Sequence, residues 1–142
     1  MPNCMKIACA VPPVRVGDVK KNATDICRII RQAGDAGVKI LVFPELCVTG
    51  YTCGDLFFQK ALIRAAAAAL VEIVEFTRAY PGMTCVVGAP VEKEGRLYNC
   101  AVVICAGEVL DIVSNDGADR RWFSSDHENR AEGRQRAAFR HL

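Results

Sequence analysis

Two short apolar runs separated by one amphipathic stretch constrain the fold of this chain more than any other feature. The runs are Lys6–Val11 and Lys39–Phe43. Between them, apolar residues recur at spacings of three and four, which predicts one buried helix face: Ala23, Ile26, Cys27, Ile30 and Ala33. Asp18 stands where a helix N-cap is expected, and Gly37 stands where the helix should end. Strand, helix and strand joined by short connections predict a βαβ unit with parallel strands.

The next segments extend this unit. Lys60–Tyr80 has the apolar stripe of a second helix, and Thr84–Ala89 reads as a third core strand. Leu97–Cys105 and Glu108–Val113 then follow as strands separated by tight turns, which is typical of an antiparallel meander. The pattern places the chain in the α/β class.

The second strand has an unusual end. Ile40–Phe43 runs directly into Pro44 and Glu45, and proline stops a strand because it cannot donate to the ladder. In an open α/β sheet, ligands bind at the carboxyl ends of the parallel strands. Glu45 is therefore either a solvated loop charge or an active-site group. In the second case we expect it to point into a cleft lined partly by the Val48–Gly54 loop.

Charge and hydropathy argue against several kinds of partner. The chain is 51% hydrophobic and 24% charged, as in globular proteins, with a net charge of +2 and no block of like charges. We therefore expect no nucleic-acid partner and no membrane partner. The longest apolar run, Ala65–Val71, is too short to span a bilayer. The N-terminal segment lacks the pattern of a secretory signal, so a cytoplasmic location is expected.

The eight cysteines do not indicate a metal site. The chain contains no C-x-x-C pair, and both histidines lie near the C-terminal end. Most cysteines lie within apolar runs, where a free thiol behaves as a small hydrophobe. We therefore expect no metal and no cofactor.

The segment around Glu45 resembles a known family. VFPELCVTGYTCGDLFFQ, Val42–Gln59, is similar to the nitrilase superfamily of carbon–nitrogen hydrolases, and in particular to the glutaminase domain of glutamine-dependent NAD synthetases. KIACAVP near the start and GRLYNCAVVICAGEVLDIV later in the chain share this resemblance, which resumes briefly at Arg120–Ser125. It implies that residues 1–113 form the first half of an α-β-β-α nitrilase-like sandwich, a partial glutamine amidase domain. Residues 114–142 are then expected to be a divergent tail.

The resemblance also implies a Glu-Lys-Cys triad, in which glutamate takes the thiol proton, cysteine attacks the amide, and lysine stabilises the oxyanion. Glu45 matches the glutamate. Tyr51 is expected to shape the wall of the substrate pocket, and a plain core tyrosine is the alternative. The other two triad members have no counterpart, because no lysine follows Lys93 and no cysteine follows Cys105. Cys47 is expected to be structural.

The sequence therefore predicts a fragment of a glutamine-hydrolysing amidase domain that supplies ammonia for NAD synthesis. Its partner would be a small-molecule amide, and the chain alone should not hydrolyse glutamine. One alternative is a non-catalytic, degenerate or interaction module that pairs with related subunits. Another is an unrelated α/β domain whose Glu45 binds a polar ligand. A half-sandwich leaves apolar surface uncovered, so we also expect a homo-oligomer.

Overall fold

The computed structural model describes residues 4–115. The elements in chain order are β1 (Ile7–Cys9), α1 (Val19–Asp35), β2 (Ile40–Val42), α2 (Lys60–Phe76), β3 (Thr84–Lys93), β4 (Arg96–Cys105) and β5 (Glu108–Ser114). Short 3-10 helices cover Gly54–Phe58 and Thr77–Ala79. The expected divergent tail lies outside the described residues from position 116 onward, so the division between residues 113 and 114 stays a prediction.

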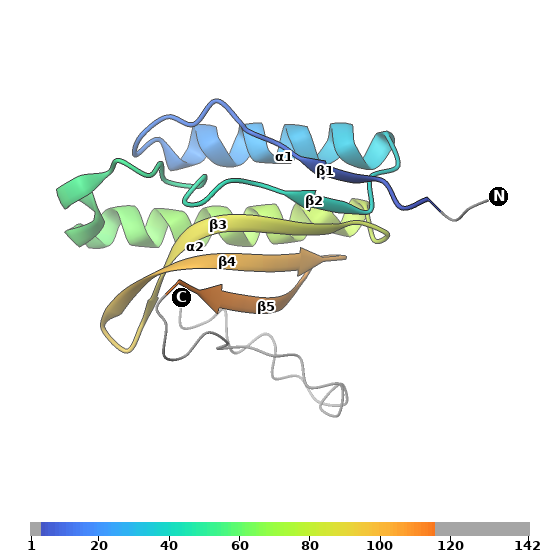
Figure 1. The fold of residues 1–142 in the computed structure, drawn as a ribbon. Coiled ribbons are helices and arrows are strands. Elements are labelled where there is room, and N and C mark those ends of the chain that lie inside the picture. The colour runs from blue at the N-terminus through green and yellow to red at the C-terminus, as the bar shows by residue number, and fades with distance from the viewer. Residues whose placement is uncertain (1–3, 116–142) are drawn as a thin grey trace.

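The strands form one mixed sheet in the order β1-β2-β3-β4-β5 (Figure 1). β1, β2 and β3 are parallel, whereas β4 and β5 are added by antiparallel pairing. This confirms the predicted βαβ unit, the meander and the α/β class. The two hairpin turns place Glu94-Gly95 and Ala106-Gly107 at positive φ, the conformation that suits a two-residue hairpin.

The helix boundaries follow local capping. The Asp18 side chain accepts a hydrogen bond from the Lys21 amide at 3.2 Å, so the predicted N-cap is confirmed. The second helix ends at Phe76 rather than at the predicted Tyr80, and continues as a 3-10 turn. At that point the buried Thr77 hydroxyl bonds to the Val74 carbonyl at 2.6 Å and accepts from the Gly107 amide at 2.9 Å. This side chain ties the helix end to the β4–β5 turn.

Both helices cover the same face of the sheet (Figure 1). The register places Leu41, Cys85 and Ile104 in one row across β2, β3 and β4, and none of the three is more than 1% exposed. The side chains that complete this core from the helices are also nearly inaccessible: Ile26, Ile30, Ala66, Leu70 and Ile73. The core therefore lies between the helices and one side of the sheet. No helix in the described part of the chain is both long and apolar enough to cross a membrane.

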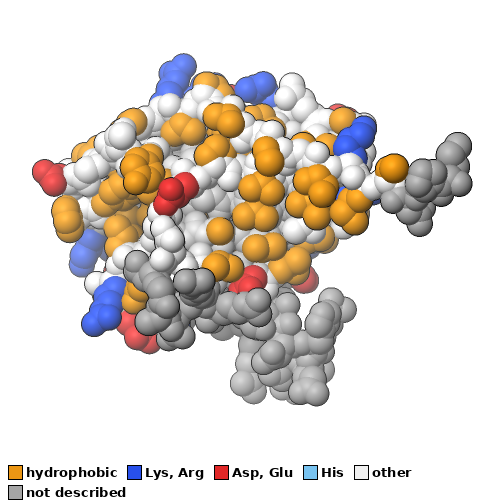
Figure 2. All heavy atoms as spheres, in the orientation of Figure 1, with side chains coloured by type: hydrophobic (Ala, Val, Ile, Leu, Met, Phe, Trp, Pro, Cys, Tyr) orange, Lys and Arg blue, Asp and Glu red, His pale blue; other side chains and the backbone are white. Residues whose placement is uncertain are grey.

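The opposite side of the sheet, which we call the open face, carries no helix in the described part of the chain. The register aligns Cys9, Val42, Val86, Val103 and Asp111 in one row across all five strands. Val42, Val86 and Val103 remain half-buried, and Cys9 is exposed. Figure 2 shows hydrophobic side chains gathered on this side of the molecule. Further apolar residues of the open face are Ile7, Ile40, Ala101, Cys105 and Val113.

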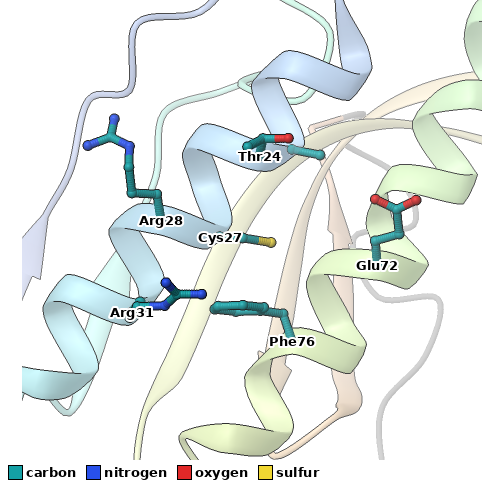
Figure 3. Close-up of a pocket in the computed structure, with 7 residues that line it drawn as sticks. Thr24, Cys27, Arg28, Arg31, Glu72 and Phe76 are labelled. Carbon is teal, nitrogen blue, oxygen red and sulfur yellow. The ribbon is translucent and has the colours of Figure 1, made fainter.

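A shallow concavity of about 460 Å³ lies between α1 and α2. Its wall includes Arg31, whose guanidinium carbon lies 5.6 Å from the centre of the Phe76 ring, and the thiol of Cys27 lies between the helices (Figure 3). Burial, followed by the nearby Glu72 carboxylate, raises the pKa of Cys27 to about 11. This thiol therefore stays protonated near neutral pH and behaves as a packing group rather than as a nucleophile.

Candidate active site

Glu45 lies at the carboxyl end of β2, as the strand-end rule predicts. The Phe43 amide still donates to the Val86 carbonyl at 2.9 Å, and Pro44 then ends the pairing. Leu46 takes a left-handed conformation with φ of 50°, and its carbonyl accepts hydrogen bonds from the Thr49 and Gly50 amides. The chain thus turns sharply after Glu45 and leaves this carboxylate at the edge of the sheet.

The backbone of this turn rests directly on β3 at Gly88. A Cβ atom at Gly88 would lie 2.4 Å from the Pro44 oxygen, 2.5 Å from the Leu46 nitrogen and 2.8 Å from the Glu45 Cα. All three are backbone atoms, and real Cβ atoms essentially never approach so closely. Only glycine therefore allows Glu45 to lie this close to the strand, which is the use of a strand glycine where another backbone approaches.

The side chain of Glu45 is held from β4. The Asn99 Nδ2 donates a hydrogen bond to Glu45 Oε1, and Asn99 is itself fixed opposite Pro90 in the β3–β4 ladder. Although Glu45 is exposed, it lines a concavity of about 450 Å³ at the end of the open face. The other lining residues are Val42, Phe43, Val86, Gly88, Asn99, Cys100, Ala101, Val113, Ser114 and Asn115. We call this concavity the Glu45 groove.

The expectation that the Val48–Gly54 loop lines this cleft is wrong. The Glu45 groove is bordered by strands β2 to β5 and by residues next to them, and no residue of that loop contributes. The first part of the loop instead packs into the interior, where Val48 and Thr49 are fully buried. Tyr51 is 68% exposed and does not line the groove, so its role in substrate binding stays a prediction.

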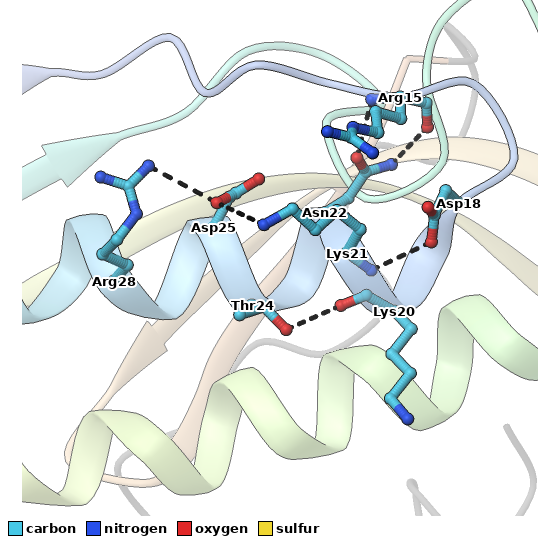
Figure 4. A network of polar contacts seen from close by, with 8 residues as sticks. All are labelled: Arg15, Asp18, Lys20, Lys21, Asn22, Thr24, Asp25 and Arg28. Atoms are coloured by element: carbon cyan, nitrogen blue, oxygen red, sulfur yellow. Dashed lines mark hydrogen bonds and ion pairs between the residues drawn. The ribbon is translucent and has the colours of Figure 1, made fainter.

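The buried side-chain amide of Asn22 on α1 holds the start of the Val48–Gly54 loop. The Asn22 Nδ2 donates to the Val48 carbonyl at 3.0 Å and to the Arg15 carbonyl at 2.8 Å. Its Oδ1 accepts from the Arg15 amide at 2.8 Å (Figure 4). Asn22 is only 1% exposed, and every polar atom of its side chain is paired. The turn that carries Glu45 is thus fixed by Gly88, Asn99 and Asn22, which come from three different elements.

The described thiols near Glu45 are not arranged as nucleophiles. Cys47 is 1% exposed, and its sulfur donates to the Gly88 carbonyl at 3.5 Å. Burial raises the pKa of Cys47 to about 11, so very little thiolate forms near pH 7. Cys100 borders the groove but is 3% exposed, and pairs in the row of Ala89 and Ser114 on the buried side of the sheet. This supports the structural role expected for Cys47.

Sequence reasoning missed two residues of this site, Gly88 and Asn99. Each left a signal in the sequence. A glycine inside the apolar run TCVVGAP marks a close backbone approach, and an asparagine inside YNCAVVIC is a polar residue in an otherwise apolar strand. Neither signal identifies which segment approaches, because that depends on the pairing of distant strands.

Comparisons with known proteins agree with this architecture. The sequence profile of the carbon-nitrogen hydrolase family matches residues 6–130. The glutamine-dependent NAD(+) synthetase of Mycobacterium leprae is 35% identical over 109 residues, which cover 77% of this chain and 16% of that protein. The enzyme of the same name from Xylella fastidiosa is 34% identical over 110 residues, which cover 77% of this chain and 20% of that protein.

Solved structures give the same result. A glutamine-dependent NAD(+) synthetase from Cytophaga hutchinsonii superposes with a TM-score of 0.73 and 30% identity, covering 80% of this chain and 19% of that chain. A mutant amidase of the nitrilase superfamily from Nesterenkonia superposes with a TM-score of 0.66 and 26% identity, covering 80% of this chain and 44% of that chain. The chain thus spans less than half of each of these proteins. On the extent of the profile match, it belongs to the carbon-nitrogen hydrolase family.

Proposed function

We propose that this chain supplies the base-bearing half of a glutamine-hydrolysing amidase domain that provides ammonia for NAD synthesis. Glu45 is the general base in this proposal. The observation that carries it is the way Glu45 is held at the mouth of a groove, with its backbone against Gly88 and its carboxylate bonded to Asn99. The similarity to glutamine-dependent NAD(+) synthetases supports the choice of glutamine as the amide.

Amide hydrolysis requires a nucleophile and an oxyanion stabiliser in addition to the base. A glutamate can take the proton of a thiol, but amide cleavage by a covalent route also needs the thiol itself and a stabiliser for the oxyanion. No residue of this sequence corresponds to the family's lysine or cysteine, and the described thiols near Glu45 are buried. We therefore propose that the 142-residue chain alone does not hydrolyse glutamine. Its proposed place of action is the cytoplasm.

The experiment is an ammonia-release assay with glutamine. The purified chain is tested alone and then mixed with a polypeptide that carries the remaining part of the glutaminase domain of the Mycobacterium leprae relative. Ammonia should appear only in the mixture and should be lost with Glu45→Gln, whereas the matched change of the exposed Glu92 near the end of β3, Glu92→Gln, should have no effect. Release that survives Glu45→Gln refutes the assignment of the base. Release by the chain alone that is lost in Cys47→Ala refutes the structural role of Cys47.

The alternative is a non-catalytic interaction module that pairs with related subunits. The exposed and half-exposed apolar side chains of the open face favour this reading, because such surfaces mark association sites. A mixture that forms a stable complex but releases no ammonia would support this alternative over the catalytic one.

A further inference from the structure

Asn115 is a polar residue of the Glu45 groove to which the role of Glu45 assigns nothing. The polar side chains that line the groove are Glu45, Asn99, Ser114 and Asn115. Glu45 and Asn99 are bonded to each other. Ser114 is 4% exposed and stands opposite Cys100 on the buried side of the sheet, so its hydroxyl is turned away from the groove. A ligand in the groove therefore meets Asn115 as well as the base.

Strand pairing places Asn115 beside Asn99. The Asn115 amide donates to the Asn99 carbonyl at 2.9 Å, which continues the antiparallel register of β4 and β5 by one residue. Residues that stand opposite each other in such a ladder point to the same face, with Cβ atoms about 4.5–5.5 Å apart. The Asn99 side chain bonds to Glu45 on this face. The Asn115 side chain therefore lies next to the group that holds the carboxylate.

The side-chain amide of Asn115 is uncommitted within residues 4–115. Asn115 is exposed, and its side chain makes no hydrogen bond to any of those residues. This distinguishes it from Asn99, whose Nδ2 bonds to Glu45. A side-chain amide carries two N–H donors and an oxygen acceptor. The groove thus presents a carboxylate and an available amide on the same side of the sheet.

Amide cleavage needs a donor where charge develops. When a thiolate supplied by another polypeptide adds to the amide carbon, a carbon–sulfur bond forms and one electron pair of the carbonyl moves onto its oxygen. On collapse that pair returns, the carbon–nitrogen bond breaks, and ammonia leaves with the proton that Glu45 took from the thiol. A fixed donor at the oxygen stabilises this charge, and an asparagine amide is one of the groups that can do so.

From this geometry we propose that Asn115 contacts the substrate carboxamide, with its Nδ2 donating to the amide oxygen and its Oδ1 accepting from the amide N–H. This inference rests on the proposed function, because it takes Glu45 as the base of the same groove. A carboxamide offers both an acceptor and donors to the Asn115 amide, whereas the carboxylate of the product glutamate offers acceptors only. The contact therefore favours glutamine over glutamate.

Ammonia release in the mixture with the complementing polypeptide tests the role in catalysis. Asn115→Leu keeps the size of the side chain and removes its donors, so kcat should fall about 100-fold. Asn115→Lys should retain release, because an ammonium group also donates to the oxygen. The matched control is Gln32→Leu, an exposed amide on α1 outside the groove lining, which should leave kcat unchanged. Urea unfolding verifies that each variant is folded.

Nuclear magnetic resonance tests the contact without any turnover. Only this chain is labelled with the heavy nitrogen isotope, and Glu45→Gln blocks the reaction. The side-chain amide signals of Asn115 are identified by their loss in Asn115→Leu. They should shift when glutamine is added and shift less with glutamate, whereas those of Gln32 should stay in place.

The outcomes separate this inference from the assignment of the base. Unchanged release by Asn115→Leu overturns it, and so does a loss of release without any shift of the Asn115 signals on addition of glutamine. An equal loss in Asn115→Lys and Asn115→Leu also refutes the donor role. If ammonia release survives Glu45→Gln but not Asn115→Leu, the base assignment fails while the contact of Asn115 with the carboxamide stands.

Discussion

Replacing Gly88 by alanine should displace the segment that carries Glu45. The new methyl group would meet three backbone atoms of Pro44, Glu45 and Leu46 at 2.4 to 2.8 Å, and backbone cannot move aside as a flexible side chain can. An ordinary contact needs about 3.4 Å or more, so the turn must shift by roughly 1 Å. That shift pulls the Val48 amide away from the Gly88 carbonyl, to which it donates at 3.2 Å.

The magnitude of the loss follows from two destabilising contributions and one that offsets them. Overpacking of a tightly filled site costs about 1–3 kcal/mol. A lost backbone hydrogen bond adds about 0.5–1.5 kcal/mol. The lower chain entropy of alanine in the unfolded state offsets about 0.4–1 kcal/mol. We therefore expect Gly88→Ala to lower the free energy of unfolding by about 2 kcal/mol, within a range of about 1–4 kcal/mol.

Urea unfolding followed by far-ultraviolet circular dichroism measures this difference. Gly82→Ala is the matched control, because a Cβ at Gly82 would lie 3.4 Å from the end of the flexible Lys39 side chain and no nearer to any backbone. It should stay within about 0.5 kcal/mol of the unmodified chain. If Gly88→Ala unfolds at the same urea concentration as Gly82→Ala, the close approach of the Glu45 segment to β3 is refuted.

Four further outcomes are expected. Asn22→Leu should lower the free energy of unfolding by about 2 kcal/mol or more, because it leaves the buried Val48 carbonyl and the part-buried Arg15 amide without their partner; a smaller loss in urea unfolding would show that water replaces the amide. In the complemented amidase, Asn99→Leu should lower kcat about 10-fold or more by releasing Glu45, and an unchanged kcat would remove Asn99 from the site. Tyr51→Ala in the same assay should raise KM with kcat unchanged, and an unaltered KM would end its assignment to substrate binding. The free energy of unfolding should fall as the pH rises above about 9, by about 1.4 kcal/mol per pH unit for Cys47. The reason is that the thiol loses its proton near pH 9 in the unfolded chain, whereas burial in the folded chain raises the pKa of Cys47 to about 11. In the same measurement, Cys47→Ala should reduce the slope.

Local chemistry made most of the fold predictable. The spacing of apolar residues in α1, the Asp18 cap and the paired hairpin turns depend on neighbours within a few positions, so they are readable from the chain alone. Two element ends differ from the prediction: β3 runs on to Lys93 rather than ending at Ala89, and the second helix ends early. Thr77 ends it early because its hydroxyl bonds to Gly107, a residue 30 positions away, which no local pattern reveals.

The sequence determined that Glu45 stands at the end of a core strand, since Pro44 must stop β2 wherever the rest of the chain lies. Which groups surround that carboxylate was decided only by the tertiary structure. Gly88 and Asn99 reach Glu45 through strand pairing across more than forty positions of sequence, and Leu46–Gly50, which directly follow Glu45, are buried instead of forming the groove. The position of a residue along its own strand depends on nearby sequence. Its neighbours on other strands depend on the register in which distant segments pair in the sheet.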